Sequence, residues 1–461
     1  MDSQNFLSGY LGWIITAVLC AVPLLFWINI HPLSVVFQGN FTTVSLAIGQ
    51  IAGLTGIVMY GLNLIYSTRL RFLENMFGGL NKVFVAHHIL GGLALILLCF
   101  HPVFLALSRV SFSPKEGALL LIPNGLLPLD ALVDNANKFH FEVLQQWAIF
   151  FGILAFWGMV VLLIITFFVK LPYQLWLAIH RYLGLAFFFA GLHVLFVSSD
   201  TSISKGLKLY LLTIACLGLL AFAYRSLLAD VFVRRYRYKV SEVDLSTKGV
   251  TQISMVPMAK KLEFKAGQFI FIKFIKSDGR IAKEWHPFSI SSSPLDDSLR
   301  VSVKSLGDFT SSLPNITKGT IAEIEGAYGK FSHSNFKNRK QIWVAGGIGI
   351  TPFLSMAKSL PSDDYKVDLY YSVRTKSELV DVQTLLKVAK TKNSNFRLIP
   401  FVSEDKKTFL SANFIKKNSA SVKNKEIFIC GPPAMMKSLK VQFKKIGVSK
   451  KMIHSEEFSL D

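Results

Sequence analysis

The hydrophobic and polar positions divide this chain of 461 residues into two parts with different patterns. Residues 10–230 hold nearly all of the long apolar runs, and six runs reach the approximately 20 residues that a helix needs to cross about 30 Å of hydrocarbon. The expected membrane spans are residues 10–30, 43–66, 84–108, 144–169, 175–198 and 207–228. The first run has no basic segment before it and no small-residue cleavage site, so we expect a helix and not a removable signal peptide.

Beyond residue 232 the pattern changes to short alternating strands separated by Gly, Pro and Asp turns. Six strands predict a small antiparallel barrel: 236–243, 251–256, 268–274, 288–291, 299–303 and 321–325. Four later strands alternate with helical segments, as in a doubly wound parallel sheet: 341–345, 366–372, 396–401 and 426–430. The predicted fold class is an α-helical membrane bundle of six spans, then an antiparallel β-barrel, then an α/β parallel-sheet domain. The expected domain bounds are residues 1–230, 231–338 and 339–461.

Charge follows the same division. Basic residues lie between spans two and three and after span six, while residues 31–42 contain no Lys or Arg, so the positive-inside rule predicts cytoplasmic termini. Residues 1–228 carry 11 Lys and Arg against 7 Asp and Glu, which leaves +17 of the net +21 in the remainder. This favours attraction to an anionic inner leaflet and to an anionic nucleotide. We therefore expect a multi-pass protein of the cytoplasmic (inner) membrane with its soluble domains in the cytoplasm.

Two other classes receive little support. The lysines are scattered without interleaved aromatic residues, so no nucleic-acid partner is expected. The four cysteines form no CxxC pair and no metal-ligand spacing, which argues against a disulfide framework or a cysteine-ligated metal.

Four histidines form two spaced pairs inside apolar runs, where ionisable residues are costly and mark functional sites. His87 and His101 are 14 residues apart, a rise of about 21 Å, and they return to within about 40° on one helix face. His180 and His193 are 13 apart, which leaves an ideal helix about 140° off, so helix distortion or another approach angle must absorb the difference. His88 is a rival to His87. The pairs predict two stacked haems; the alternative is that they pair with polar neighbours and bind nothing.

Three segments of the soluble part have the pattern of phosphate- or ligand-binding turns. Residues 346–352 form a Gly-rich turn between a strand and a helix, where a backbone can approach a pyrophosphate at a helix N-terminus. Residues 307–310 (G-D-F-T) are a second candidate for a helix N-terminus that faces a phosphate. Residues 430–436 (C-G-P-P-A-M-M) follow a strand at its carboxyl end, where open α/β sheets bind ligands. The alternatives are a tight turn without ligand and an ordinary Asp/Thr cap.

Arg374 follows the second strand of the nucleotide sheet, where the ribose end of a dinucleotide is expected. Arginine can hold a 2′-phosphate bidentately and Lys376 adds charge, whereas the nearest acidic residue along the chain, Glu378, lies four residues beyond. The pattern predicts NADPH in preference to NADH. The alternative is a solvated basic turn.

Taken in order, these motifs resemble the NADPH oxidase and ferric reductase superfamily, bacterial branch, along almost the full chain. The paired histidines resemble its bis-histidine ligands on the third and fifth spans. Residues 286–289 (H-P-F-S) are similar to its flavin motif, and residues 325–331 (E-G-A-Y-G-K-F) to the turn before its nucleotide domain. Residues 345–352 (A-G-G-I-G-I-T-P) resemble its pyrophosphate loop and residues 430–433 (C-G-P-P) its nicotinamide-side loop. Residues 456–458 (E-E-F) resemble the segment whose aromatic covers the flavin.

The resemblance implies a chain of cofactors: NADPH or NADH, FAD and two b-type haems, which are non-covalent because no CxxCH motif occurs. The implied haem ligands are His87, His101, His180 and His193. The implied cofactor-binding residues are His286, Pro287, Phe288, Ser289, Gly307, Thr310, Gly346, Gly347, Gly349, Thr351, Arg374, Cys430, Gly431, Pro432 and Phe458. The implied catalytic residues are Ser289, Cys430 and Phe458, with the Ser289 hydroxyl near flavin N5.

The implied function is transfer of electrons from cytoplasmic NAD(P)H through FAD and the haems to an extracytoplasmic one-electron acceptor, with oxygen giving superoxide expected first. Two departures from the animal oxidases weaken that reading: Leu105 stands where they carry a further His, and residues 43–66 contain no Arg. Ferric-chelate reduction is the alternative, and a haem subunit serving a quinone or protein partner is a further one. A transporter with a regulatory nucleotide domain is the remaining class. No obligatory protein partner is expected.

Overall fold

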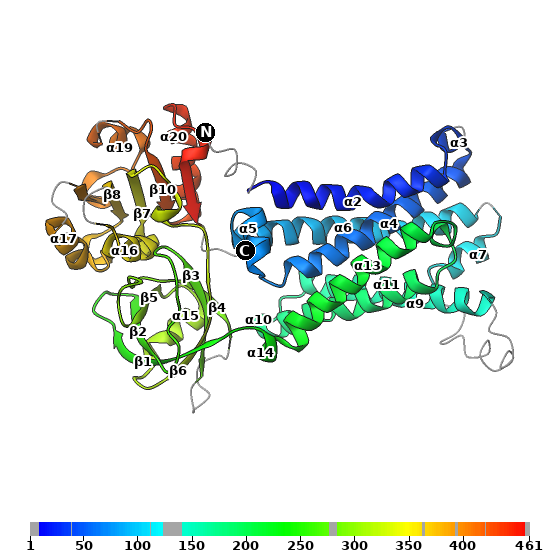
Figure 1. The fold of residues 1–461 in the computed structure, drawn as a ribbon, viewed down its shortest axis with the longest axis horizontal. Helices are drawn as coiled ribbons and strands as arrows, with labels where there is room; N and C mark the ends of the chain where they lie inside the picture. The colour runs from blue at the N-terminus through cyan, green and yellow to red at the C-terminus, as the bar shows by residue number, and fades with distance from the viewer. Residues whose placement is uncertain are drawn as a thin grey trace. The chain divides into compact units, whose positions relative to one another are not determined.

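Six helices among the described residues are long and apolar enough to cross a membrane, which confirms the predicted spans. The computed structural model describes residues 9–37, 39–110, 112–122, 141–275, 284–361, 365–391, 395–419 and 421–456. The chain forms two compact units, Met1–Val233 and Arg234–Asp461 (Figure 1).

The helical unit is built from α2 (Leu11–Ile30), α4 (Phe41–Tyr66), α6 (Leu80–Val110), α9 (Phe141–Phe168), α10 (Tyr173–Arg181), α11 (Leu183–Phe196) and α13 (Lys205–Phe222). Shorter helices join or follow them: α3 (Leu33–Phe37), α5 (Arg71–Phe77), α7 (Pro114–Leu119), α12 (Asp200–Ile203), the π-helical η1 (Ala223–Leu227) and α14 (Ala229–Phe232). The helix α4 packs against α6 and α13, and α11 packs against α9.

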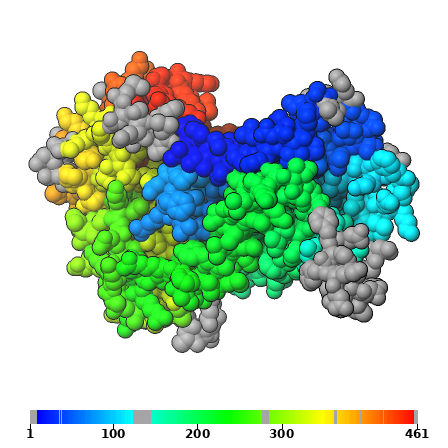
Figure 2. All heavy atoms as spheres, turned by 45° about the vertical axis from the view of Figure 1, so that its right-hand side comes forward, coloured from blue at the N-terminus to red at the C-terminus, as the bar shows by residue number. Residues whose placement is uncertain are grey.

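The outward faces of this bundle are apolar. Figure 2 shows α2 (blue) and α13 (green) at the surface of the unit. Both helices expose aliphatic side chains, among them Ile14, Val18, Leu25, Leu209, Leu217 and Leu220. A soluble protein rarely exposes such continuous apolar surface, whereas a lipid-facing bundle requires it.

The fifth span is interrupted at Tyr182, between the two histidines that it carries. The Tyr182 N–H donates to the Ile179 carbonyl (3.0 Å) and the Leu185 N–H donates to the Tyr182 carbonyl (2.9 Å), which are contacts of a tighter 3₁₀-type turn. Thirteen α-helical steps stop about 140° short of four turns, and each 3₁₀ step advances about 120° in place of about 100°. The interruption therefore shifts the phase of His193 relative to His180 in the direction that the spacing requires.

The soluble unit contains two sheets, as predicted. The first is antiparallel, in the order β4-β3-β6-β1-β2-β5. Its strands are β1 (Tyr236–Asp244), β2 (Val250–Pro257), β3 (Phe269–Ile275), β4 (His286–Ser289), β5 (Leu299–Lys304) and β6 (Ile321–Tyr328). The strand β4 begins two residues earlier than expected, so the H-P-F-S motif is itself the strand.

The second sheet is parallel, in the order β11-β10-β7-β8-β9. Its strands are β7 (Lys340–Gly346), β8 (Lys366–Val373), β9 (Phe396–Val402), β10 (Glu426–Cys430) and β11 (Ile453–Glu456). The main helices around it are α16 (Thr351–Lys358), α17 (Val382–Thr391), α19 (Ala412–Asn418) and α20 (Pro433–Lys445). Separate apolar clusters, around Trp343 and Phe353 and around Tyr370 and Phe443, form its core. Strand β11 was missed because its four residues include His and Glu and do not alternate.

Candidate functional site

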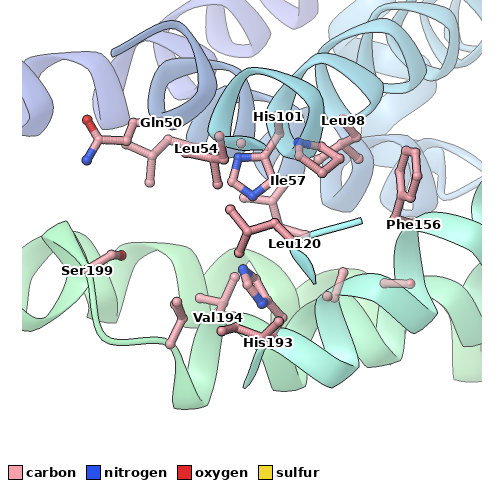
Figure 3. A pocket seen from close by; sticks show the side chains of 18 of the residues that line it. Gln50, Leu54, Ile57, Leu98, His101, Leu120, Phe156, His193, Val194 and Ser199 are labelled. Carbon is pink, nitrogen blue, oxygen red and sulfur yellow. The ribbon is translucent and has the colours of Figure 1, made fainter. Parts of the chain in front are cut away.

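Two of the predicted ligands, His101 and His193, lie opposite each other in the helical unit. Their ring centroids are 6.2 Å apart and they line a cavity of ≈ 340 Å³. Figure 3 shows the two rings directed towards each other from α6 and α11, with Leu54, Ile57 and Phe156 also lining the cavity.

Each of these rings is oriented by a backbone carbonyl. The Nδ1 of His101 lies 2.8 Å from the Gly49 carbonyl oxygen, and the Nδ1 of His193 lies 2.8 Å from that of Ala148. A carbonyl oxygen only accepts, so Nδ1 carries the proton and Nε2 keeps its lone pair. This is the arrangement that fixes a histidine as a metal ligand.

Two glycines leave the space that these rings occupy, and sequence reasoning missed both. A Cβ at Gly53 of α4 would overlap the His101 ring, and one at Gly152 of α9 would lie 2.7 Å from the His193 Nδ1. A glycine inside an apolar run has many explanations, so only the contacts identify these two.

The other predicted pair, His87 and His180, has ring centroids 6.4 Å apart. The Nδ1 of His87 lies 3.1 Å from the Asn63 carbonyl oxygen. The His180 ring instead stacks on Trp176 (centroids 5.1 Å apart, planes 9° apart), and its buried Nδ1 has no hydrogen-bond partner among the described residues. The rival His88 is exposed.

Both separations fit two imidazoles on one iron. With a metal–nitrogen bond of about 2 Å and roughly 1.1 Å from nitrogen to ring centre, opposed rings place their centroids about 6.2 Å apart. Across the described parts of the chain, no group of three or more His, Cys, Asp or Glu side chains could hold a metal ion. Each pair therefore offers two ligands, which suits an iron whose other four positions are filled by a porphyrin.

The cavity of His101 and His193 has a polar end that the sequence did not predict. Asp200 lines it together with Gln50. The Asp200 carboxylate, 5% exposed, accepts from the Gln50 amide (3.4 Å) and from His31 Nε2 (2.9 Å).

In the soluble unit, the structure brings two predicted flavin segments together. Phe309, in α15 (Asp308–Ser312), stacks on His286 of β4 with centroids 3.6 Å apart. Burial lowers the pKa of His286, and its hydrogen bond to Glu284 (3.0 Å) acts in the opposite direction. Ser289 ends the strand and is buried.

The turn at Gly307 is stabilised by hydrogen bonds to the Thr310 side chain. The Thr310 hydroxyl accepts from the Leu306 and Gly307 N–H groups (2.9 and 3.0 Å). No described atom lies within 4 Å of the position of a Cβ at Gly307, so the turn presents open backbone to a ligand. Phe288 and Pro287 lie on β4 beside it and are half-buried.

The two predicted nucleotide loops are packed against each other. A Cβ at Gly346 would lie 2.9 Å from Pro432, and one at Gly349 would overlap the Cys430 carbonyl. At Gly431 it would lie 2.9 Å from the Gly346 Cα. Glycine is therefore needed for contact between the loops after β7 and β10.

Gly347 differs from its neighbours, because it has a φ of +53° and open space around its Cβ position. Gly347 is therefore the position at which the backbone can approach a pyrophosphate. Thr351 begins α16, is buried, and donates to the Ile348 carbonyl (3.1 Å). The Cys430 side chain is fully buried, and burial, followed by the nearby Glu456, raises the pKa of its thiol well above the ordinary value.

Arg374 is placed differently from the expectation. Its Nε lies 2.9 Å from the Glu404 carboxylate, and Lys376 lies 3.3 Å from that of Asp405. These two carboxylates arrive from the segment after β9, so acidic side chains lie beside Arg374 that are distant from it along the chain. Phe458 lies outside the described residues.

Comparison with known proteins assigns all three regions. Residues 52–191 match the ferric reductase like transmembrane component, residues 235–344 an FAD-binding domain and residues 343–440 an oxidoreductase NAD-binding domain. The chain is 35% identical over 175 residues to ferric reduction oxidase 8 of Arabidopsis thaliana, and 30% identical over 136 residues to dual oxidase 2 of Rattus norvegicus. The chain therefore combines a ferric reductase like transmembrane component with FAD-binding and NAD-binding oxidoreductase domains.

These similarities cover parts of the proteins. The alignments span 33% and 28% of this chain, and 23% and 9% of the plant and rat relatives. Among solved structures, a ferredoxin NADP⁺ reductase from Neisseria gonorrhoeae with bound FAD and NADP is 20% identical, covers 49% of this chain and 99% of its own, and has a TM-score of 0.42.

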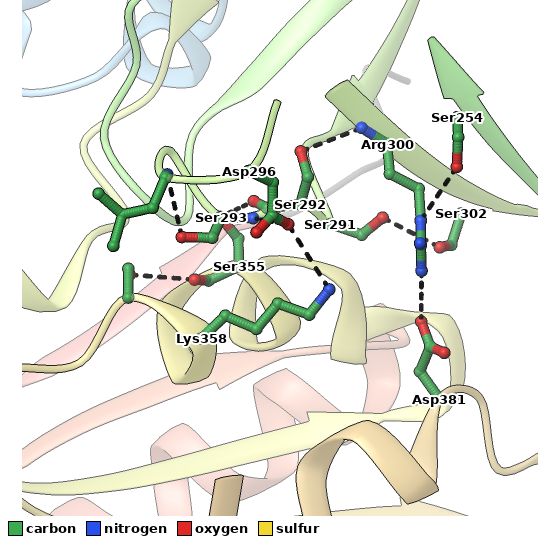
Figure 4. A network of polar contacts seen from close by, with 12 residues as sticks. Ser254, Ser291, Ser292, Ser293, Asp296, Arg300, Ser302, Ser355, Lys358 and Asp381 are labelled. Carbon is green, nitrogen blue, oxygen red and sulfur yellow. Dashed lines mark hydrogen bonds and ion pairs between the residues drawn. The ribbon is translucent and has the colours of Figure 1, made fainter. Parts of the chain in front are cut away.

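A polar network joins the FAD-binding domain to the NAD-binding domain of this oxidoreductase (Figure 4). The Ser355 hydroxyl of α16 donates to the Ser292 carbonyl (2.6 Å). Arg300 of β5 donates to the Ser254 hydroxyl (3.2 Å) and lies 3.6 Å from the Asp381 carboxylate. The contacts hold the end of the flavin strand beside the nucleotide helix, and none of these residues stood out in the sequence.

Proposed function

We propose that this oxidoreductase takes electrons from cytoplasmic NADPH or NADH and delivers them singly to an acceptor outside the cytoplasmic membrane. Oxygen, reduced to superoxide, is the acceptor that we propose first. The observation that carries the proposal is the presence of two opposed histidine pairs, 6.2 and 6.4 Å between centroids, in a chain that also has FAD- and NAD-binding domains.

When bound, FAD accepts a hydride and releases electrons one at a time, and two haems carry single electrons. We assign residues 1–230 to the haem-binding domain, 231–338 to the FAD domain and 339–461 to the nucleotide domain. The loops at Gly347 and Gly431 would hold the nucleotide, and β4 with the Gly307 turn would hold the flavin. Ser289, Cys430 and Phe458 remain our candidates nearest to the hydride.

In the membrane, His87 and His180 would hold one haem and His101 and His193 the other. The carbonyl of Asn63 supports the choice of His87 over His88, since it orients the ring as in the other pair. With two histidines holding each iron, the haems would supply single-electron transfer, and the acceptor would not need to bind to the metal. We place the His87 end at the cytoplasmic side from the distribution of Lys and Arg.

Ferric-chelate reduction is the second candidate. It is favoured by the match of residues 52–191 to the ferric reductase component and by Leu105, which lines the cavity where animal oxidases carry a His. One experiment separates the candidates: purified full-length protein with FAD and NADPH is assayed in air for dismutase-sensitive reduction of a reporter, and without oxygen for reduction of a ferric chelate.

The ligand assignment is tested by haem content and absorption spectra. We expect two haems per chain, and loss of one with each of His87→Ala, His101→Ala, His180→Ala and His193→Ala. His88→Ala is the matched control and should keep both haems. A full complement with an unchanged spectrum in His101→Ala, or absence of any haem band in the purified protein, contradicts the proposal.

A further inference from the structure

The segments that follow β8 and β9 are joined by two ion pairs and a backbone hydrogen bond. Arg374 pairs with Glu404 (2.9 Å) and Lys376 with Asp405 (3.3 Å). The Glu404 N–H donates to the Arg374 carbonyl (3.2 Å), so the two segments are also fixed to each other by the main chain. A third carboxylate, Glu378, accepts from the Arg374 N–H (3.1 Å). This acid–base cluster contains two cationic and three anionic side chains.

Its position in the sheet relates it to the nucleotide. In a doubly wound sheet the pyrophosphate binds after the first strand, here at Gly347 after β7, and the adenosine ribose lies beyond the carboxyl end of the adjacent strand. That strand is β8, since Gly346 pairs with Ser372, and β9 is the next, since Val373 pairs with Val402. The cluster therefore lies where the 2′ position of the ribose is expected.

We propose that Glu404 and Asp405 determine which pyridine nucleotide this chain uses, by competing with a 2′-phosphate for Arg374 and Lys376. The inference rests on the proposed use of NAD(P)H as donor. The carboxylates make the native site favour NADH, whose 2′-hydroxyl can donate to a carboxylate. NADPH binds only when its phosphate displaces Glu404 and Asp405 from their partners.

The physical reason is the sign of the local charge. A phosphate monoester carries about −1.5 to −2 charges at neutral pH and is repelled by nearby carboxylates. The four paired side chains are 52–77% exposed, so each pair is weak and opens readily, and solvent and salt screen the repulsion. The effect on binding is consequently a preference of roughly tenfold and not exclusion of NADPH.

The test is direct binding of NADP⁺ and NAD⁺ to the purified, FAD-loaded full chain by calorimetry at fixed ionic strength. We expect Glu404→Gln with Asp405→Asn to lower the Kd of NADP⁺ about tenfold and to raise that of NAD⁺ about twofold. The matched control, Glu263→Gln with Asp297→Asn, removes the same charge from exposed positions of the FAD domain. It should leave the ratio of the two Kd values within about twofold of the native ratio.

A second comparison isolates the competition. Arg374→Ala should weaken NADP⁺ binding about twofold in the native chain, where Glu404 engages the guanidinium, and about tenfold in the Glu404→Gln, Asp405→Asn background. An unchanged ratio of Kd values, equal shifts for both nucleotides, or the same Arg374→Ala effect in both backgrounds overturns the inference while leaving the proposed donor intact. If neither NADP⁺ nor NAD⁺ bound to any form of the protein, the proposed function itself would be removed.

Discussion

The outer histidine pair can be tested through the glycine that makes room for it. In Gly53→Ala the new methyl group would overlap the His101 ring, with 2.7 Å to its Cε1. The ring must rotate away, which breaks its hydrogen bond to the Gly49 carbonyl (2.8 Å) and strains its side-chain torsion. The lost hydrogen bond costs about 0.5–1.5 kcal/mol and the strained torsion a similar amount. Together these weaken haem binding at this pair by about 1–3 kcal/mol, or roughly 5- to 150-fold.

The assay is haem stoichiometry with a redox titration of the purified protein, in which the two haems are separated by their potentials. We expect Gly53→Ala to lose the haem of the His101 pair and to keep that of the His87 pair. Gly92→Ala is the matched control, because no described atom outside its own helix lies within 4 Å of that Cβ position and alanine favours a helix. Two haems with native potentials in Gly53→Ala would refute the assignment of His101 to the cavity.

Three further outcomes follow from the soluble unit. Gly349→Ala should abolish nucleotide binding while FAD stays bound, because the new methyl group would overlap the Cys430 carbonyl oxygen and push the two nucleotide loops apart. Nucleotide binding is measured by calorimetry and bound FAD by absorption spectroscopy, and an equal loss of nucleotide and FAD would contradict this. Burial lowers the pKa of His333 to about 4, so this histidine is protonated less readily in the folded chain than in the unfolded one. The free energy of unfolding should therefore fall by up to about 3 kcal/mol as the pH is lowered from 6.5 to 4. In His333→Gln, unfolding curves measured across this range should show a smaller dependence on pH. Asp368→Ala should cost about 1–3 kcal/mol, because the buried Ser419 hydroxyl loses its carboxylate acceptor (2.6 Å), whereas the half-exposed Arg397 can be solvated by water. An unchanged unfolding midpoint would argue against that role.

The fold was largely predictable because both of its halves obey simple length and period rules. A run such as residues 43–66 is too long and too apolar for anything but a buried or membrane helix. The barrel strands alternate, and the parallel strands are short apolar runs followed by Gly-rich turns. The turn at Tyr182 was not predictable in position, because no Pro or Gly occupies that residue, although the spacing of His180 and His193 required some distortion.

The candidate site was predictable only where one residue carries the signal. A histidine in an apolar run is conspicuous, whereas Gly53 and Gly152 resemble any small residue of a membrane helix. The same holds for Ser355 and Arg300, whose contacts between the two soluble domains depend on Ser292 and Asp381, which lie more than 60 positions away along the chain. Contact partners of this kind are determined by how the elements pack in three dimensions, and the periodicity of the sequence does not predict that packing.

The cluster at Arg374 shows how such partners can still be anticipated. Adjacent parallel strands end at the same edge of a sheet, so the residues after β8 and those after β9 must meet there. Glu404 and Asp405 follow β9 directly, as Arg374 and Lys376 follow β8. A basic residue after one strand therefore cannot be assigned to a phosphate until the residues after the neighbouring strand are considered. Here those residues are acidic and already paired with Arg374 and Lys376, which is why we propose that this edge discriminates between the two riboses.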